Sequence, residues 1–187
     1  MALFPHSVAD AVGAADEMRR ELACFNAERM RHNAEPIEIG IGIHFGTLML
    51  GTIGEIERME GTVISDAVNL AARLESATKT TGATVIISED TIREIAKATG
   101  HDAFLFRHLG EAKVQGKAKP ITMYEVFSGD PDDLKTEKLK SKEKFEEGVV
   151  HMLSNNYGKA RELFKGIYNP AVPDRVVATY LETLVEK

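Results

Sequence analysis

The sequence predicts an α+β fold followed by a helical tail, and three observations predict it. Apolar residues recur every three or four positions from about residue 8 to 32, a spacing typical of a helix. Ile37, Ile39, Ile41 and Ile43 alternate with polar residues or glycine, which is typical of a strand with one buried face. After a turn-rich segment at 128–136, which we interpret as a hinge, the apolar spacing becomes helical again.

Capping residues and breakers set the limits of the elements before the hinge. Ser7 can cap the first helix, which ends before Pro36, and Ser88 can cap a later helix that runs to Gly100. In chain order we expect a helix over 8–32, strands over 37–43 and 48–53, a polar loop over 54–61, a short apolar piece over 62–64, a helix over 66–80, a strand over 83–87, a helix over 88–100, and strands over 104–109 and 121–127 joined by the loop 110–120.

Three apolar-periodic segments follow the hinge, at about 137–155, 157–168 and 174–186, and we assign residues 137–187 to a helical tail. Gly148, Ala160 and Phe164 match the small–small–aromatic spacing of a tetratricopeptide helix pair, which would make the tail a protein-interaction module. About three such repeats are normally needed for a stacked superhelix. The alternative is a helical cap that packs on the first part of the chain or on a partner.

Composition narrows the class of protein. The chain has 187 residues, of which 43% are hydrophobic and 28% charged, as in a globular protein of one domain with an extension. The net charge of −6 argues against nucleic acid as a partner, because such binding needs a basic face. A single cysteine, Cys24, excludes an internal disulfide and fits the cytoplasm, and no apolar run is long enough for a membrane segment.

Polar residues on the helix 66–80 are the strongest candidates for a functional site. Asp66, Asn69 and Arg73 are spaced by three and four, so they lie on one face. A guanidinium can bind a phosphate bidentately and an amide can orient a sugar oxygen, which is typical of sites that stabilise charge during phosphoryl transfer. From spacing alone, the alternative of a solvated helix face is the more common one.

Longer motifs indicate a family. Gly40-Ile-Gly-Ile-His-Phe-Gly46, Gly51-Thr-Ile-Gly54 and Val63-Ile-Ser-Asp-Ala-Val-Asn-Leu-Ala-Ala-Arg-Leu-Glu75 resemble the C-terminal half of a class III nucleotidyl cyclase domain. Residues 106–120, followed by Tyr124-Glu-Val126, resemble the last two strands of that domain. The resemblance covers residues 1–127 and implies part of a ferredoxin-like βαββαβ fold. It also implies conversion of ATP or GTP to the 3′,5′-cyclic nucleotide and pyrophosphate, at the interface of a head-to-tail dimer.

The resemblance assigns roles to individual residues. Asn69 corresponds to the asparagine that orients the ribose, and Arg73 to the arginine that stabilises the phosphate in the transition state. Thr62 stands where the family reads the purine base, and a threonine there favours ATP over GTP. Gln115 stands where many members have a lysine that binds the triphosphate, and we expect Lys117 to bind it instead.

A metal is also implied, since complete domains of the family use Mg²⁺ or Mn²⁺. The family's two metal-binding aspartates would precede Met1, so we expect these ligands to be absent from this chain and the isolated chain to be inactive. It could act as a homodimer, or lend Asn69 and Arg73 to a full-length cyclase subunit. The alternative function is a non-catalytic module for dimerisation or nucleotide binding. We also expect one edge of the strand 37–43 to be unpaired and open to self-association.

His44 and Cys24 are of residue types that often bind metals or react, but we interpret both as structural residues. His44 lacks neighbours with metal-ligand spacing and is interpreted as a surface or packing histidine. Cys24 lies beside the apolar positions of the first helix and is interpreted as a core residue rather than a nucleophile.

Overall fold

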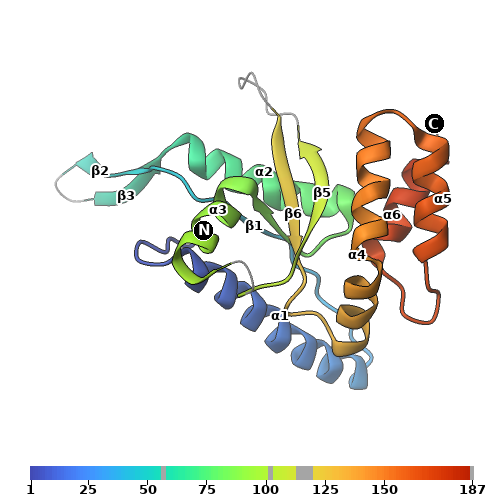
Figure 1. Ribbon diagram of the computed structural model, residues 1–187. Coiled ribbons are helices and arrows are strands. Elements are labelled where there is room, and N and C mark those ends of the chain that lie inside the picture. Colours follow the sequence, from blue (N-terminus) through green and yellow to red (C-terminus); the bar gives the residue numbers. More distant parts are fainter. Residues whose placement is uncertain (56–57, 101–102, 113–119, 186–187) are drawn as a thin grey trace.

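The computed structural model describes residues 1–55, 58–100, 103–112 and 120–185 (Figure 1). Helices and strands follow one another in an α+β arrangement, as predicted. The elements are α1 (Val8–Arg31), β1 (Ile41–Ile43), β2 (Met49–Glu55), β3 (Arg58–Ile64), α2 (Asp66–Thr81), β4 (Val85–Ser88), α3 (Glu89–Thr99), β5 (Phe106–Ala112), β6 (Ile121–Val126), α4 (Asp132–Leu153), α5 (Tyr157–Ile167) and α6 (Arg175–Thr183).

A mixed four-stranded sheet in the order β1-β4-β6-β5 forms the centre of the molecule. Strand β1 pairs with β4 in parallel, and the other neighbours are antiparallel. Strand β1 therefore lies at an edge of the described sheet, as the sequence predicts. Strands β2 and β3 form a separate antiparallel hairpin, which projects from the body of the molecule at the start of α2 (Figure 1).

The sheet has a core on each face. On one face, residues of α1 and α3 pack on the strands, with Val12 and Ile95 meeting Val85, Ile87 and Val126. On the other face lie α2 and the three tail helices, whose apolar side chains surround the alternate strand residues Ile86, Leu109 and Met123. This alternation along β4 and its neighbours is what a strand covered on both faces requires.

The strand predicted over 37–43 is shorter than expected. Only residues 41–43 form β1, because the segment before it is bound by a helix side chain instead of a strand. The Asn26 amide donates to the carbonyl of Ile37 and accepts from its amide, both at 2.8 Å. A period of two is therefore present in the sequence, but the backbone groups of Ile37 are already satisfied by α1.

Two predicted loops contain strand. Residues 58–61, expected in the polar loop 54–61, belong to β3 and pair with β2, so that Gly61 lies opposite Thr52. Strand β5 likewise extends to Ala112, opposite Ile121. Both strands are held by cross-strand pairing, which a local reading of polar and glycine residues does not reveal.

The tail helices lie against the sheet (Figure 1). Helix α4 begins at Asp132, so residues 132–136, predicted as part of the hinge, are helical. Helices α4 and α5 form a hairpin in which a Cβ atom on Gly148 would lie 2.7 Å from the Phe164 ring. The small–aromatic contact expected from the spacing is present, while kinship with tetratricopeptide repeats stays a prediction.

The two structural interpretations of single residues have opposite outcomes. Cys24 is exposed on α1, so the prediction of a core cysteine is wrong. The apolar positions around it do not face the sheet: Phe25 is 50% exposed. His44 is half-buried and its Nδ1 lies 2.7 Å from the Ser88 hydroxyl, in agreement with a packing role.

Candidate functional site

The candidate residues Asn69 and Arg73 lie on the exposed face of α2. The residues that follow each of them, Leu70 and Leu74, are buried and hold an adjacent face of the helix in the core. Since residues four apart on a helix are neighbours, the amide and the guanidinium emerge on the same side. The structure thus brings together the two residues predicted to carry the chemistry.

Both ends of α2 are fixed by specific caps. At its start the Ser65 hydroxyl accepts from the Ala67 amide at 3.0 Å and donates to the Thr47 carbonyl at 2.6 Å. At its end Gly82 adopts the left-handed conformation, with φ of 80°. The start of the helix is therefore tied to the segment that follows β1, and Asn69 lies within the first turns.

Glycines in and before β1 allow α2 to lie directly on the strand. A Cβ atom on Gly42 would collide with the backbone carbonyl of Ala71 and the backbone amide of Glu75. One on Gly40 would collide with the Thr78 hydroxyl. Backbone therefore meets backbone along this contact, which sets the height of α2 above the sheet without long side chains between them.

Hydroxyl groups connect the end of β1 to the start of α3. The Ser88 hydroxyl contacts His44 and lies 2.9 Å from the Thr91 hydroxyl. Thr91 also accepts from the Phe45 amide at 3.0 Å. This network fixes residues 44 and 45, which precede the β2–β3 hairpin, and the hairpin in turn leads into α2.

The two predicted substrate-binding residues are placed less fully. Thr62 lies in β3, opposite Gly51 of β2, and its side chain is outside the described part of the chain. Lys117 lies outside the described residues altogether, as does Gln115. What the structure gives is their connectivity: β3 leads directly into α2, and residues 112 and 121, which flank the lysine segment, pair with each other.

Within the described residues, no group of three or more histidine, cysteine, aspartate or glutamate side chains is arranged to hold a metal ion. The described part therefore does not fit the divalent metal that this kind of site would use, and we derive no chemical step through one. None of the described helices is both long and apolar enough to cross a membrane.

A buried group of charges, which we did not predict, joins the sheet to the tail. Arg107 of β5 is fully buried and binds Glu125, its cross-strand partner on β6. It also donates to both carboxylate oxygens of Asp174, at 2.5 and 2.9 Å. Lys138 of α4 binds Glu125 at 2.7 Å and Asp130 at 2.6 Å. We call these five residues the junction cluster.

The electrostatics of the junction cluster favour its charged state. Burial opposes the charge on Arg107, but Glu125 and Asp174 outweigh it and raise the pKa of the guanidinium above its ordinary value. Burial also opposes the charge on Asp174, yet the hydrogen bond and charge of Arg107 hold the pKa of this carboxyl below its ordinary value. The guanidinium further lies 4.1 Å from the centre of the Phe145 ring, which adds a cation–π contact from α4.

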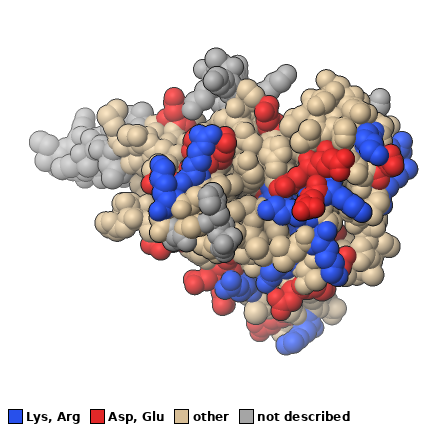
Figure 2. Space-filling view, viewed as in Figure 1, with Lys and Arg blue, Asp and Glu red and all other residues tan. Residues whose placement is uncertain are grey.

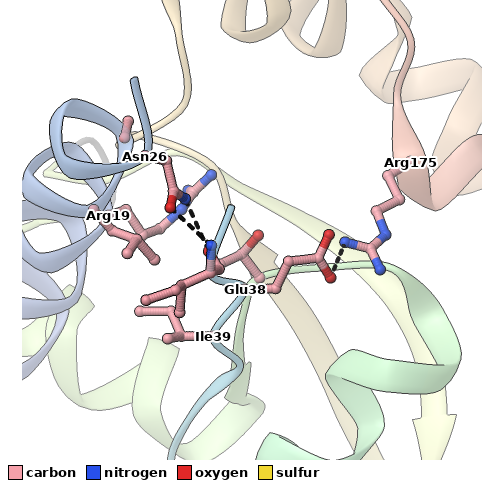
Figure 3. A pocket seen from close by; sticks show the side chains of 9 residues that line it. Arg19, Asn26, Glu38, Ile39 and Arg175 are labelled. Carbon is pink, nitrogen blue, oxygen red and sulfur yellow. Dashed lines mark hydrogen bonds and ion pairs between the residues drawn. The ribbon is translucent and has the colours of Figure 1, made fainter. Parts of the chain in front are cut away.

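A pocket of about 240 Å³ lies beside the junction cluster, between α1, residues 37–39 and the start of α6 (Figure 3). Arg175 reaches from the tail to Glu38 at 2.9 Å, and Arg19, whose guanidinium binds Asp130, lines the pocket from α1. Neither Asn69 nor Arg73 lines it. On the face shown in Figure 2, acidic and basic side chains lie next to one another.

The matched family is the one that the sequence motifs indicate. A model described as the adenylate and guanylate cyclase catalytic domain matches residues 4–127. The chain belongs to this family. Domains of this family generally use a divalent metal ion.

Cyclases of distant organisms are similar to this chain. It is 29% identical over 191 residues to the terminal-differentiation-specific adenylate cyclase of Dictyostelium discoideum, a match that covers 100% of this chain and 9% of that protein. It is 39% identical over 132 residues to an adenylate cyclase of Anabaena cylindrica, which covers 67% of this chain and 26% of that protein. The chain thus spans a small part of the curated relatives that it matches.

Solved cyclase structures share the fold. The adenylyl cyclase CyaB from P. aeruginosa is 30% identical with a TM-score of 0.52, over 64% of this chain and 58% of that one. The guanylyl cyclase Cya2 gives the same identity and TM-score, over 67% of this chain and 61% of that one. The predicted α+β class and cyclase family are therefore confirmed.

Proposed function

We propose that this chain supplies one half of an adenylyl cyclase site, in which Asn69 orients the ribose of ATP and Arg73 stabilises the phosphate during ring closure. The observation that carries this proposal is the joint exposure of Asn69 and Arg73 on one side of α2, above buried Leu70 and Leu74. The alternative of a solvated helix face does not explain why this pair lies within a segment that resembles a cyclase motif. The product would be 3′,5′-cyclic AMP, with pyrophosphate as the leaving group.

Arg73 is suited to a charge that develops during the reaction. Attack of the 3′-oxygen on the α-phosphorus builds negative charge on the phosphate oxygens and on the departing pyrophosphate. A guanidinium placed at these oxygens stabilises that charge through two parallel hydrogen bonds. Asn69, one turn earlier, can hold the ribose so that the 3′-oxygen is aligned for attack.

Substrate choice rests on Thr62 and triphosphate binding on Lys117. The resemblance at this position supports ATP rather than GTP, and the threonine hydroxyl can accept a hydrogen bond from the amino group of adenine. Lys117 would neutralise the triphosphate as a point charge. The similarity of this chain to relatives described as adenylate cyclases supports the same preference.

The complete site would form between two chains, either in a homodimer or with a full-length cyclase subunit. In the pairing with a full-length subunit, that subunit would bring the metal-binding carboxylates, for which we propose Mg²⁺ or Mn²⁺, and this chain would bring Asn69 and Arg73. We place the protein in the cytoplasm, where its substrate ATP is abundant. The helical tail would then be available to a protein partner as well.

Complementation tests the half-site directly. The 187-residue chain is mixed with a complete cyclase domain of the same protein that carries Arg73→Ala, and cyclic nucleotide is measured with ATP or GTP and excess Mn²⁺. The isolated chain should be inactive and the Arg73→Ala domain should show only its low residual activity, whereas the mixture should form cyclic AMP much faster, because one of the two interfacial sites is then intact.

The matched control is the same mixture with Arg73→Ala in both components, which should form product no faster than the Arg73→Ala domain alone. Product with GTP but not ATP would overturn the substrate assignment. Nucleotide binding without product in any mixture would contradict the half-site and favour a non-catalytic module. Clear product from the isolated chain would show that metal ligands exist within these residues.

A further inference from the structure

Helix α6 lies between the two parts of the molecule that the proposed site depends on. It contacts the C-terminal end of α2, the helix that carries Asn69 and Arg73. It also contacts β5, which forms one edge of the sheet. The family match ends at residue 127, so α6 is outside the matched domain. The match to the Dictyostelium adenylate cyclase nevertheless covers the whole of this chain, tail included.

The contact between α6 and α2 is close. Gly82 ends α2, and a Cβ atom there would lie 2.8 Å from the Thr179 hydroxyl oxygen and 3.0 Å from the Arg175 carbonyl. About two turns further into α2, Leu74 is 1% exposed and belongs to the same apolar cluster as Val177 and Tyr180 of α6. Leu74 is the residue after Arg73, so a displacement of α2 at its contact with α6 would also displace the guanidinium.

The contact between α6 and β5 is polar and specific. The Tyr180 hydroxyl donates to the Leu109 carbonyl at 2.7 Å, at the point where β5 bulges between His108 and Gly110. On the same strand the His108 amide donates to Glu146 of α4 at 2.8 Å. These bonds satisfy backbone groups at a bulge of β5, which is an edge strand of the described sheet.

The junction cluster anchors α6 to the sheet at its first residue. Asp174 caps the helix by accepting from the Val176 amide at 3.0 Å, and the same carboxylate binds the buried Arg107 of β5. One aspartate therefore fixes both the start of α6 and the strand beneath it. The helix is held at two points on β5, through Asp174 and through Tyr180, and presents its side to the end of α2.

We propose that α6 is a positioning element of the cyclase half-site, and that Tyr180 is a positioning residue that acts through Leu74 and α2 on Asn69 and Arg73. This inference rests on the proposed function. It extends that function to residues outside the matched domain: the tail holds α2 at a fixed place relative to the sheet. A displacement well under the ~1 Å that costs about a hundredfold in rate is sufficient for a measurable loss.

The test uses Tyr180→Phe in a form of the protein with a complete cyclase domain. This change removes the hydroxyl bond to Leu109 and keeps the ring, which stacks on Phe145. We expect kcat to fall about tenfold with little change in KM for ATP, because the affected side chains act on the transition state. Tyr168→Phe, at an exposed tyrosine of the same tail, is the matched control and should leave kcat unchanged.

A double-mutant cycle separates positioning from a general loss of folded protein. Because Tyr180 acts in part through Arg73, the effect of Tyr180→Phe on kcat should be smaller in an Arg73→Ala background than in the unaltered domain. The same tenfold loss in both backgrounds, or no loss in either, would overturn the proposal.

Hydrogen exchange on the 187-residue chain provides a second readout that does not depend on activity. Tyr180→Phe should accelerate exchange of the amides in the last two turns of α2 and at the bulge of β5, relative to the amides of α3. Unchanged exchange in α2 overturns the inference. Absence of product from the unaltered protein would count against the proposed function, and the exchange result would then decide on α6 by itself.

Discussion

Arg73 allows the role of a charged side chain in catalysis to be separated from its role in affinity. We predict that Arg73→Ala in a complete domain lowers kcat by roughly two to three orders of magnitude, as for loss of one donor to a developing oxyanion. ATP affinity, measured by equilibrium titration, should be nearly unchanged. Lys79→Ala, at an exposed cation on the same helix, is the control and should have little effect on kcat. Equal losses in affinity and turnover would instead assign Arg73 to ground-state binding.

His108 makes the stability of the fold depend on pH. Burial lowers the pKa of this imidazole in the folded protein, although the nearby Glu146, Glu111 and Glu89 act in the opposite direction. Protonation therefore favours the unfolded chain, whose histidine has a pKa of about 6.5. The stabilising contribution is complete above that pH and is lost as the pH falls towards the lower, folded pKa.

The matching variant is His108→Gln. We expect it to flatten the decrease in the free energy of unfolding between about pH 6.5 and pH 5, as measured by urea denaturation at several pH values. His32→Gln, at an exposed histidine, should leave the decrease intact. A pH dependence that persists in His108→Gln would assign the effect to other groups.

The residues that could be predicted from sequence are those whose chemistry is visible along a single helix. Asn69 and Arg73 are four apart, so their common face follows from helix geometry alone. Arg107, by contrast, lies 18 residues from Glu125 and 67 from Asp174, and nothing local identifies these partners. The sequence offered only a weaker signal for this cluster, which is that Arg107 and Glu125 are charged residues within two otherwise apolar strands.

At the level of elements, the approach of α2 to β1 depends on Gly42. We predict that Gly42→Ala destabilises the protein by about 1–3 kcal/mol, because the new methyl group meets backbone atoms of Ala71 and Glu75 that cannot rotate away. The measurement is the free energy of unfolding from urea denaturation. In a complete domain the same change should lower cyclase activity, since it lifts the helix that carries Arg73.

Gly13→Ala is the matched control for this contact. Gly13 lies inside α1, and no heavy atom would lie within 4 Å of the added methyl group. Alanine is favoured over glycine in a helix by about 1 kcal/mol, so this variant should be neutral or slightly stabilised. If Gly42→Ala were as stable as Gly13→Ala, the methyl group at residue 42 would meet no backbone atom. That result would show that α2 does not lie on β1 as described.

Helices were predicted more closely than strands, for a physical reason. The limits of α1, α2 and α3 agree with the predictions within about two residues, because caps and the 3.6-residue period are local features. Strand β1 is short because Asn26 binds the backbone of Ile37, and β3 is long because β2 pairs with it. Both outcomes depend on contacts between segments, which the period of two does not encode.

At the scale of the whole molecule, the question is whether the tail is a separate unit. Its helices share one apolar cluster with α2 and the sheet, and the junction cluster connects α4 and α6 to β5 and β6. Removal of residues 129–187 would expose Leu109 and Met123 to water and leave Arg107 without Asp174. We predicted a hinge at this boundary because turn residues gather there. Turn residues indicate that the chain changes direction, and by themselves they do not indicate an independent domain.

We therefore predict that residues 1–128 alone show no cooperative urea transition by circular dichroism, whereas the whole chain does. Within the whole chain, Asp174→Asn should cost about 3–5 kcal/mol, because it removes one partner of a buried ion pair and leaves the guanidinium under-compensated. Asp132→Asn, at a side chain that is 99% exposed, is the matched control and should change stability by less than about 0.5 kcal/mol. If the shortened chain unfolds at the same urea concentration as the whole chain, the tail contributes nothing to the sheet, and the coupling of α6 to α2 would be excluded with it.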